Sequence, residues 1–589
     1  MKSLSYLNKY LVKYKWRLIL GVVFITASNF FGVEMPRIVK KAVDLFGKKI
    51  EELKTTSITD IDKSDILEGA FYLALIYVGL SLCRGVFVFL NRQTIIIMSR
   101  LIEYDLKNEI YSHYQKLTPA FYKNNNTGDL MNRISEDVSK VRMYLGPAIM
   151  YSINLVVLSV LTIYYMVSVN LELTLYALAP LPIMTIMIYY ISRVMNQRSE
   201  EVQRQQSIVS TFVQESFSGI RVVKAYNMQK SLSKSFLKEV DSYKSKSMNL
   251  ATINAFFFPV IVLLIGASTV LTIYIGGIKA NAGEITNGDI AAFVIYVNML
   301  TWPFASIGWV TSMVQRAAAS QTRINEFLKQ EPEIFSKENA VAMKGGDIVF
   351  NNASFVYPDS GIKALQNVSF TLSEGKTLGI IGETGSGKST IANMIARLYE
   401  VTSGEVKLGG NNITDINLAQ LRQAIGYVPQ DSFLFSNSIG NNIKFGLSEL
   451  DESSGKKMEQ AARDAHIYDN IIDFENGFDT IVGERGITLS GGQKQRVSIA
   501  RAIIKHPDIL IFDDCLSALD TETEAIILRN LKRIMEGKTS VIISHRISSL
   551  EHADLILVMN EGKVIEQGTH EELLAEDGYY ASLNSKQKI

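Results

Sequence analysis

The sequence contains few cysteines and no excess of charge of either sign. Cys83 and Cys515 are the only cysteines among its 589 residues, the first within an apolar run and the second directly after two aspartates. These two thiols indicate neither a disulfide framework nor a zinc site. The net charge is +1, so no overall bias points to a nucleic-acid partner. The chain is too long for one hydrophobic core, and we expect at least two domains.

The amino-terminal segment, residues 1–17, carries five basic residues and no acidic one. It lacks the pattern of a short apolar stretch followed by a small-residue cleavage site, so we do not expect a signal peptide. Because an apolar span follows at once, we expect an amphipathic helix that lies on the cytoplasmic face of a membrane. The alternative is a solvated basic helix.

Hydrophobic residues make up 47% of the chain and gather in six stretches. Each stretch is long enough to cross a bilayer, which takes about 20 residues of helix. Two connections, residues 91–144 and 192–254, are long, charged and rich in helix formers, so we expect helical pairs that extend far from the membrane on its cytoplasmic side. The predicted spans are residues 16–36, 67–90, 145–169, 173–191, 255–278 and 290–314, within a transmembrane domain of residues 1–328.

The pattern changes after a polar linker, residues 329–346. From Asp347 onward, short β-branched and aromatic runs such as "TLGIIG", "DILIFD" and "SVIISH" alternate with helical stretches. This alternation predicts an α/β domain with a largely parallel sheet over residues 347–589.

A glycine-rich segment, "GETGSGKST", follows one of these strands and opens a helix. It fits the P-loop pattern G-x-x-x-x-G-K-[ST], in which backbone N–H groups and the helix amino terminus surround phosphates. Lys388 is expected to reach the outer phosphates of ATP, and the Ser389 hydroxyl is expected to bind Mg²⁺. The predicted nucleotide-binding residues of this segment are Gly382, Glu383, Thr384, Gly385, Ser386, Gly387, Lys388, Ser389 and Thr390.

Two further motifs follow the P-loop along the chain. Asp513 ends the strand "DILIFD" and is a candidate Mg²⁺ ligand, a weak signal that becomes strong beside the P-loop. The segment "LSGGQKQR" places Ser490, Gly491, Gly492 and Gln493 at a second helix start suited to an anion. The predicted fold class is therefore a multi-domain membrane protein: a six-helix all-α transmembrane domain with long cytoplasmic extensions, then an α/β P-loop nucleotide-binding domain.

Together these motifs resemble the nucleotide-binding domain of ATP-binding cassette (ABC) proteins, over nearly all of residues 347–589. The resemblance implies that Tyr357 stacks on adenine and that Gln430 senses Mg²⁺ and belongs to the catalytic and metal-binding set. It also implies that His545 contacts the terminal phosphate and that Asp520 faces a second subunit. Six spans with two long extensions, and segments such as "FYKNNNTGDLMNRISEDV" and "ESFSGIRVVKAY", resemble an ABC exporter half-transporter with the type IV transmembrane fold. In this family each ATP lies between the P-loop of one subunit and the signature of the other, which implies a dimer.

One residue departs from the family pattern. Asp514 stands where hydrolysing cassettes have a glutamate, and its carboxylate is shorter by roughly one C–C bond. Because a misplacement of about 1 Å can cost on the order of 10²-fold in rate, we expect this chain's site to bind ATP and hydrolyse it slowly. The resemblance to the hydrolysis-poor subunit of heterodimeric multidrug exporters implies a second, different half-transporter. The alternatives are an active homodimer and an ATP-gated regulatory or channel-like subunit.

The cargo is the least specified property. Ionisable groups in apolar spans usually face the bundle interior or a cavity, and Glu34, Arg37 and Arg84 lie in or near such spans. We rank interfacial placement of Glu34 and Arg37, and a buried structural pair for Arg84, ahead of contact with cargo. The expectation is export of hydrophobic small molecules or lipids across a bacterial inner membrane, with a cytoplasmic nucleotide-binding domain.

Overall fold

The computed structural model describes residues 2–55, 63–483, 489–516 and 521–587. The chain divides into two compact units, and the boundary does not follow one cut in the sequence. The first unit comprises Met1–Ser112 and Gly128–Gln330, and the second comprises His113–Thr127 and Glu331–Ile589. The domain limits expected from the sequence, residues 1–328 and 347–589, stay predictions.

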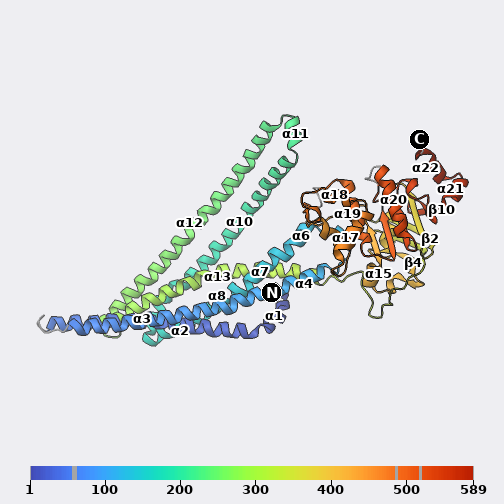
Figure 1. Ribbon diagram of the computed structural model, residues 1–589. Helices are drawn as coiled ribbons and strands as arrows, with labels where there is room; N and C mark the ends of the chain where they lie inside the picture. The colour runs from blue at the N-terminus through green and yellow to red at the C-terminus, as the bar shows by residue number, and fades with distance from the viewer. Residues whose placement is uncertain (1, 56–62, 484–488, 517–520, 588–589) are drawn as a thin grey trace. The chain divides into compact units, whose positions relative to one another are not determined.

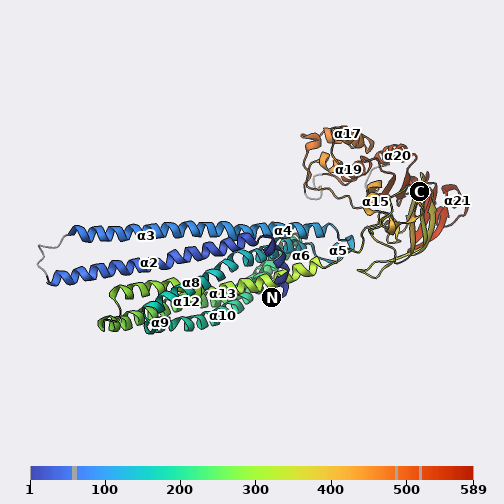
Figure 2. The same ribbon diagram turned by 90° about the horizontal axis from the view of Figure 1, so that it is seen from below.

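The first unit is helical. Within the described residues, six helical segments are long and apolar enough to cross a membrane, which confirms the six predicted spans. Helices α2 and α3 lie side by side (Figures 1 and 2). The elements are η1 (Lys2–Leu7), α1 (Asn8–Lys13), α2 (Lys15–Thr55), α3 (Lys63–Asn91), α4 (Ile97–Tyr114), α6 (Thr127–Asn132), α7 (Val138–Met143), α8 (Ile149–Val169), α9 (Leu171–Leu178), α10 (Pro180–Ser218), α11 (Ile220–Ala225), α12 (Gln229–Asn281) and α13 (Asn287–Leu328), with π-helical turns η3 (Arg92–Ile96), η4 (Arg133–Asp137) and η5 (Tyr144–Ala148).

The bundle core is formed by α2, α8, α9 and α13. Val33, Met166, Leu173 and Phe293 are buried together there. The Tyr296 hydroxyl is buried among them and donates to the carbonyl of Val33 at 3.0 Å, which satisfies the one polar group that this large side chain brings into the core.

The amino-terminal segment packs on the protein's own helices, and its place relative to a membrane stays a prediction. It is helical and amphipathic, and Leu4, Leu7 and Tyr10 are buried against the protein's own helices. Two of its five basic side chains pair with α4: Lys9 Nζ lies 2.6 Å from Glu109 Oε1, and Lys13 Nζ lies 2.6 Å from an oxygen of Asp105. The acidic residues of α4 thus supply partners that the segment's own sequence does not show, and part of its apolar face packs on protein.

The charged residues of the spans follow two patterns. Arg37 Nη1 lies 2.9 Å from Glu34 Oε1, and the Tyr165 hydroxyl donates to the same oxygen at 2.5 Å. Glu34 and Arg37 are therefore paired with each other inside the first unit. Arg84 is exposed in the single chain and packs beside Gly32, so the buried pair expected for it is not seen among the described residues.

Helices α10 and α12 lie side by side and meet at the short helix α11 (Figure 1). Among the residues of α11, none is buried. The flanking aromatic rings are also open, with Phe217 71% and Tyr226 76% exposed. The tip of this predicted extension therefore presents apolar side chains that the single chain leaves uncovered.

The described residues of the second unit form two sheets. A six-stranded sheet has the order β10-β9-β3-β8-β7-β6 and is parallel except for β10, as the sequence predicted; an antiparallel sheet of order β2-β1-β4-β5 was not predicted. Strands β7 and β8 are buried along their whole length, as expected for continuous hydrophobic runs in a covered parallel sheet. The strands are β1 (Ile348–Val356), β2 (Lys363–Leu372), β3 (Thr377–Gly382), β4 (Ser403–Leu408), β5 (Asn411–Asn412), β6 (Ile425–Val428), β7 (Ile509–Asp513), β8 (Thr539–Ile543), β9 (Leu555–Asn560) and β10 (Lys563–Gly568).

Helices cover the sheets, and one of them comes from an early part of the chain. Helix α5 (Pro119–Asn124) belongs to the second unit. Its Ala120 is buried in the same cluster as Phe355 and Tyr399. The other helices are α14 (Lys388–Ile395), α15 (Leu418–Ala424), α16 (Ile439–Lys444), α17 (Ser454–Asp464), α18 (Tyr468–Ile472), α19 (Gly491–Ile503), α20 (Thr521–Met535), α21 (His570–Ala575) and α22 (Tyr579–Gln587), with 3₁₀ turns η6 (Ile413–Asp415), η7 (Gly477–Asp479) and η9 (Ile547–Ser549).

Candidate functional site

The glycine-rich segment forms the turn from β3 into α14. Gly382 has φ +154° and Gly387 has φ +97°. A Cβ at Gly382 would lie 2.1 Å from the carbonyl oxygen of Met559, and one at Gly387 would lie 2.2 Å from that of Ala364. Backbone therefore fills the space that a side chain would need, so the sequence requires glycine at both positions.

The buried polar groups of this turn are suited to an anion. Lys388 is buried, and its ammonium donates to the carbonyl oxygens of Gly382 at 2.8 Å and Glu383 at 2.7 Å. Burial lowers the pKa of Lys388. The Ser386 hydroxyl is also buried and has no hydrogen-bond partner among the described residues. A phosphate would supply acceptors for both groups.

Beside this turn, α14 and the end of β7 place oxygen atoms that are suited to a divalent cation. The Ser389 hydroxyl donates to Asp513 Oδ1 at 2.8 Å, and the Tyr427 hydroxyl lies 3.5 Å from Asp513 Oδ2. Burial raises the pKa of Asp513, and the charge of Asp514 adds to this effect. A hydroxyl and one carboxylate fit Mg²⁺, which commonly takes its other ligands from water and substrate phosphates.

A cavity of about 310 Å³ joins these groups. Asp514, Gln430 and His545 line it together with Lys388, Ser389 and Asp513. Asp514 has φ +45°, and its N–H donates to the carbonyl of Ile543 at 2.9 Å. Gln430 Nε2 lies 3.5 Å from Asp514 Oδ2. The structure thus brings together residues that are more than 100 positions apart in the sequence.

Tyr357 lines the same cavity, as do Thr384 and Thr390. Its ring packs edge-on against Tyr399 at 5.4 Å between centroids, and its hydroxyl lies 3.2 Å from Thr390 Oγ1. The Lys123 ammonium, from α5, lies 4.9 Å from the centre of the Tyr357 ring. The sequence did not predict this contact between Lys123 and Tyr357, which joins residues more than 200 positions apart.

The second predicted anion-binding helix start lies elsewhere. Ser490 caps α19 in a reciprocal pair with Gln493: the Ser490 N–H donates to Gln493 Oε1 at 3.0 Å, and the Gln493 N–H donates to Ser490 Oγ at 3.3 Å. Ser490, Gly491, Gly492 and Gln493 are not among the residues that line the cavity. Asp520 lies outside the described residues.

The carboxyl-terminal helix α22 reaches two parts of the site, which the sequence did not predict. The Tyr579 hydroxyl donates to Glu383 Oε1 at 3.1 Å. Gln587 Nε2 donates to the carbonyl of His545 at 2.7 Å, while Gln587 Oε1 accepts from the N–H of Ile547 at 2.9 Å. Both ends of α22 therefore contact loops that border the cavity.

Comparisons with known proteins agree with this geometry. The family model for the ABC transporter transmembrane region matches residues 18–304, and the one for the ABC transporter domain matches residues 365–517. The chain is 36% identical over 579 residues to the probable multidrug resistance ABC transporter ATP-binding/permease protein YheI of Bacillus subtilis, covering 98% of this chain and 96% of that protein. It is 34% identical over 511 residues to the ATP-dependent lipid A-core flippase of Pseudomonas syringae pv. tomato, covering 87% of this chain and 84% of that protein.

A solved structure has the same fold. A bacterial Atm1-family ABC exporter with ATP bound superposes with a TM-score of 0.78 at 25% sequence identity, covering 97% of this chain and 99% of that one. The similarity therefore extends over both the helical and the α/β units.

Proposed function

Because the chain belongs to the ABC transporter family and is an ATPase-coupled membrane transporter, we propose that it is one half of an exporter dimer whose own ATP site hydrolyses slowly. The observation that carries the proposal is the cavity in which Lys388, Ser389, Asp513 and the shortened carboxylate of Asp514 meet. The slow site implies a different partner subunit, so the proposed assembly is a heterodimer.

Different residues of the cavity bind different parts of ATP. The backbone of Gly382–Ser389 surrounds the phosphates, and Lys388 exchanges its two carbonyl partners for phosphate oxygens. Tyr357 stacks on adenine, and His545 contacts the terminal phosphate. Ser389 and Asp513, with Gln430 nearby, would hold Mg²⁺, which neutralises charge on the outer phosphates when it is bound.

Two observations support a second subunit. The signature residues Ser490–Gln493 are absent from the cavity lining, so a site that contains both motifs needs another copy or another chain. The tip at α11 leaves apolar side chains open, including Val222 at 61% exposure and Tyr226. Exposed apolar side chains clustered at one tip suit a protein partner. In the assembly we propose, α11 contacts the other subunit's nucleotide-binding domain.

Asp514 determines which kind of dimer we favour. A water-polarising carboxylate must lie within about 2.6–3.2 Å of its water, and an aspartate reaches less far than a glutamate from the same backbone position. The signature of this chain, Ser490–Gln493, is well formed. It can therefore complete a fast site on a partner that carries glutamate. The alternative is a homodimer in which backbone adjustment restores the carboxylate position.

Steady-state ATPase activity separates these assemblies. We expect the chain purified alone in nanodiscs to turn over ATP slowly, and co-expression with a half-transporter that carries glutamate at the equivalent position to raise turnover by about 10²-fold or more. Lys388→Ala in each preparation measures the background. Rapid turnover by the chain alone, lost in Lys388→Ala, would establish the homodimer instead.

The proposed cargo is a hydrophobic small molecule or a lipid, in keeping with the names of the relatives. Glu34 pairs with Arg37, and we rank a placement at the membrane interface ahead of contact with cargo for both residues. We propose a bacterial inner membrane as the location, with the α/β unit cytoplasmic, as the basic residues of the two extensions indicate.

Helix α22 provides a finer test of the site. Gln587 holds the backbone on both sides of Arg546 through two hydrogen bonds that position His545. Because these bonds are lost in Gln587→Ala, we expect this variant to lower ATP turnover about two- to tenfold and to leave ATP affinity unchanged. The variants are compared in the Asp514→Glu background, in which this chain's site should turn over fastest. Lys586→Ala is the matched control. A loss of the same size when His545 is already alanine would contradict a role through His545.

A further inference from the structure

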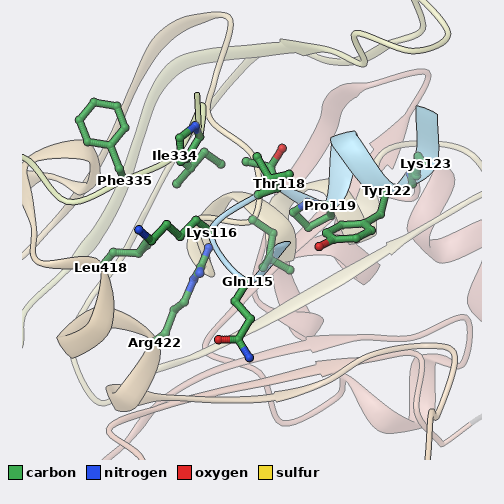
Figure 3. Close-up of a pocket in the computed structure, with 13 residues that line it drawn as sticks. Gln115, Lys116, Thr118, Pro119, Tyr122, Lys123, Ile334, Phe335, Leu418 and Arg422 are labelled. Carbon is green, nitrogen blue, oxygen red and sulfur yellow. The ribbon is translucent and has the colours of Figure 1, made fainter. Parts of the chain in front are cut away.

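A second cavity lies in the second unit, apart from the nucleotide cavity. Its volume is about 710 Å³, and it is lined by α5 with the preceding residues 115–118, by Pro332, Ile334 and Phe335, and by α15 with Leu398 (Figure 3). It shares no lining residue with the nucleotide cavity.

The charged side chains of this cavity are all of one sign. Lys116, Lys123 and Arg422 line it, and no aspartate or glutamate does. Among the described residues, Lys116 and Arg422 have no carboxylate within ion-pair distance. Figure 3 shows Arg422 extending from α15 toward the segment that carries Lys116.

Arg422 is a cation in an unfavourable place. One of its nitrogen atoms, Nη2, donates to the carbonyl oxygen of Arg397 at 2.8 Å. Burial, and then the positive charge of Arg397, lower the pKa of Arg422. Arg397 itself is neutralised by Glu400 at 2.7 Å, so the cavity keeps an uncompensated positive charge. An anion beside Arg422 would relieve this cost, and a guanidinium suits a phosphate or carboxylate bound through two oxygens.

Most of the other lining residues are apolar. Leu117, Pro119, Ile334, Phe335 and Leu398 line the cavity. The Phe335 ring is 58% exposed, although the carbonyl of the same residue is held by Arg397 Nη2 at 3.1 Å. A bound group with an apolar body would cover this ring, which a simple inorganic ion would leave open.

We propose that this cavity binds a small amphipathic organic anion, with its phosphate or carboxylate between Lys116 and Arg422 and its apolar body against Phe335 and Leu398. Lys123 connects the cavity to the nucleotide site, since its ammonium lies 4.9 Å from the Tyr357 ring and 5.8 Å from the Tyr399 ring. An anion in the cavity draws Lys123 away from Tyr357 and weakens ATP binding; this second step depends on the proposed role of Tyr357.

The test measures binding of 1-naphthyl phosphate to the full-length chain in nanodiscs by calorimetry, first without nucleotide. We expect Arg422→Gln and Lys116→Gln each to raise the dissociation constant at least about tenfold. Inorganic phosphate and 1-naphthol should each bind more weakly than 1-naphthyl phosphate. Lys116→Gln guards against misfolding, because among the described residues the Lys116 side chain makes no hydrogen bond. Lys456→Gln on α17 is the matched surface control. Equal affinity for 1-naphthyl phosphate in the unchanged chain, Arg422→Gln, Lys116→Gln and Lys456→Gln would overturn the site.

The coupling is measured separately with ATP. Saturating 1-naphthyl phosphate should weaken ATP binding about two- to fivefold, the size of a partly exposed cation–π contact, and ATP should weaken 1-naphthyl phosphate by the same factor. Lys123→Gln should remove this effect and leave 1-naphthyl phosphate bound. An unchanged ATP affinity would overturn the coupling, and complete displacement by ATP would place the probe in the nucleotide cavity and overturn the site. Failure of the chain to bind ATP at all would count against the proposed function and not against this cavity.

Discussion

Replacing Asp514 with glutamate is expected to raise ATP turnover at this chain's own site by about 10²-fold. The backbone at this position is fixed by the N–H of Asp514, which donates to the carbonyl of Ile543 at 2.9 Å. The extra methylene of glutamate therefore extends the carboxylate toward the cavity and does not shift the strand. The measurement is the single-turnover rate of ATP cleavage by the full-length chain, which separates the chemical step from product release.

Two controls accompany Asp514→Glu. Asp514→Asn keeps the size and removes the charge, and we expect it to lower the rate below that of the unchanged chain. Asp473→Glu lengthens an exposed carboxylate at the end of α18 and should change nothing. A rate in Asp514→Glu equal to that of the unchanged chain would show that the carboxylate's reach does not limit hydrolysis, and the slow-site proposal would fail.

Gly387→Ala is expected to disrupt the P-loop, whereas Gly385→Ala is a matched control for backbone strain. Both glycines have positive φ, +97° and +85°. A Cβ at Gly387 would lie 2.2 Å from the carbonyl oxygen of Ala364, while one at Gly385 would meet nothing within 4 Å. Strain alone should cost about 1–2 kcal/mol at either position, and the overlap at Gly387 should add about 1–3 kcal/mol more.

The readout for the glycine pair is calorimetric unfolding without nucleotide, so that contacts of a new side chain with ATP play no part. Gly387→Ala should unfold at a clearly lower temperature than Gly385→Ala, and it should lose ATP binding. Equal unfolding temperatures for the two variants would mean that strand β2, which carries Ala364, yields to the new side chain. The close approach would then not be what selects glycine at this position.

The sequence predicted the parts of the fold whose signals are local. The six spans, the P-loop turn and the parallel strands that carry Asp513 and precede His545 each depend on a short run of residues, and the structure contains them. The roles of the site residues stay predictions, but their proximity in one cavity is a finding.

The contacts that the sequence did not predict are between distant segments. Tyr579 meets Glu383 across 196 positions, and Lys123 meets Tyr357 across more than 200. The amino-terminal segment was expected on a membrane face because it is basic and an apolar span follows at once. Only the fold shows that Asp105 and Glu109 are the partners of two of the segment's basic residues. Periodicity describes which face of a helix is apolar, and it does not identify the surface that covers this face.

Helix α5 has a consequence for dissecting the protein. The part of the chain that carries the P-loop is completed by residues 113–127, and Ala120 fills a place in its core. A fragment that begins at Glu331 would therefore lack α5. The apolar surface that Ala120 covers would be exposed to solvent, which favours aggregation. Conversely, proteolytic cleavage between α13 and β1 would leave the two products attached to each other through α5. A native gel would therefore still show one band.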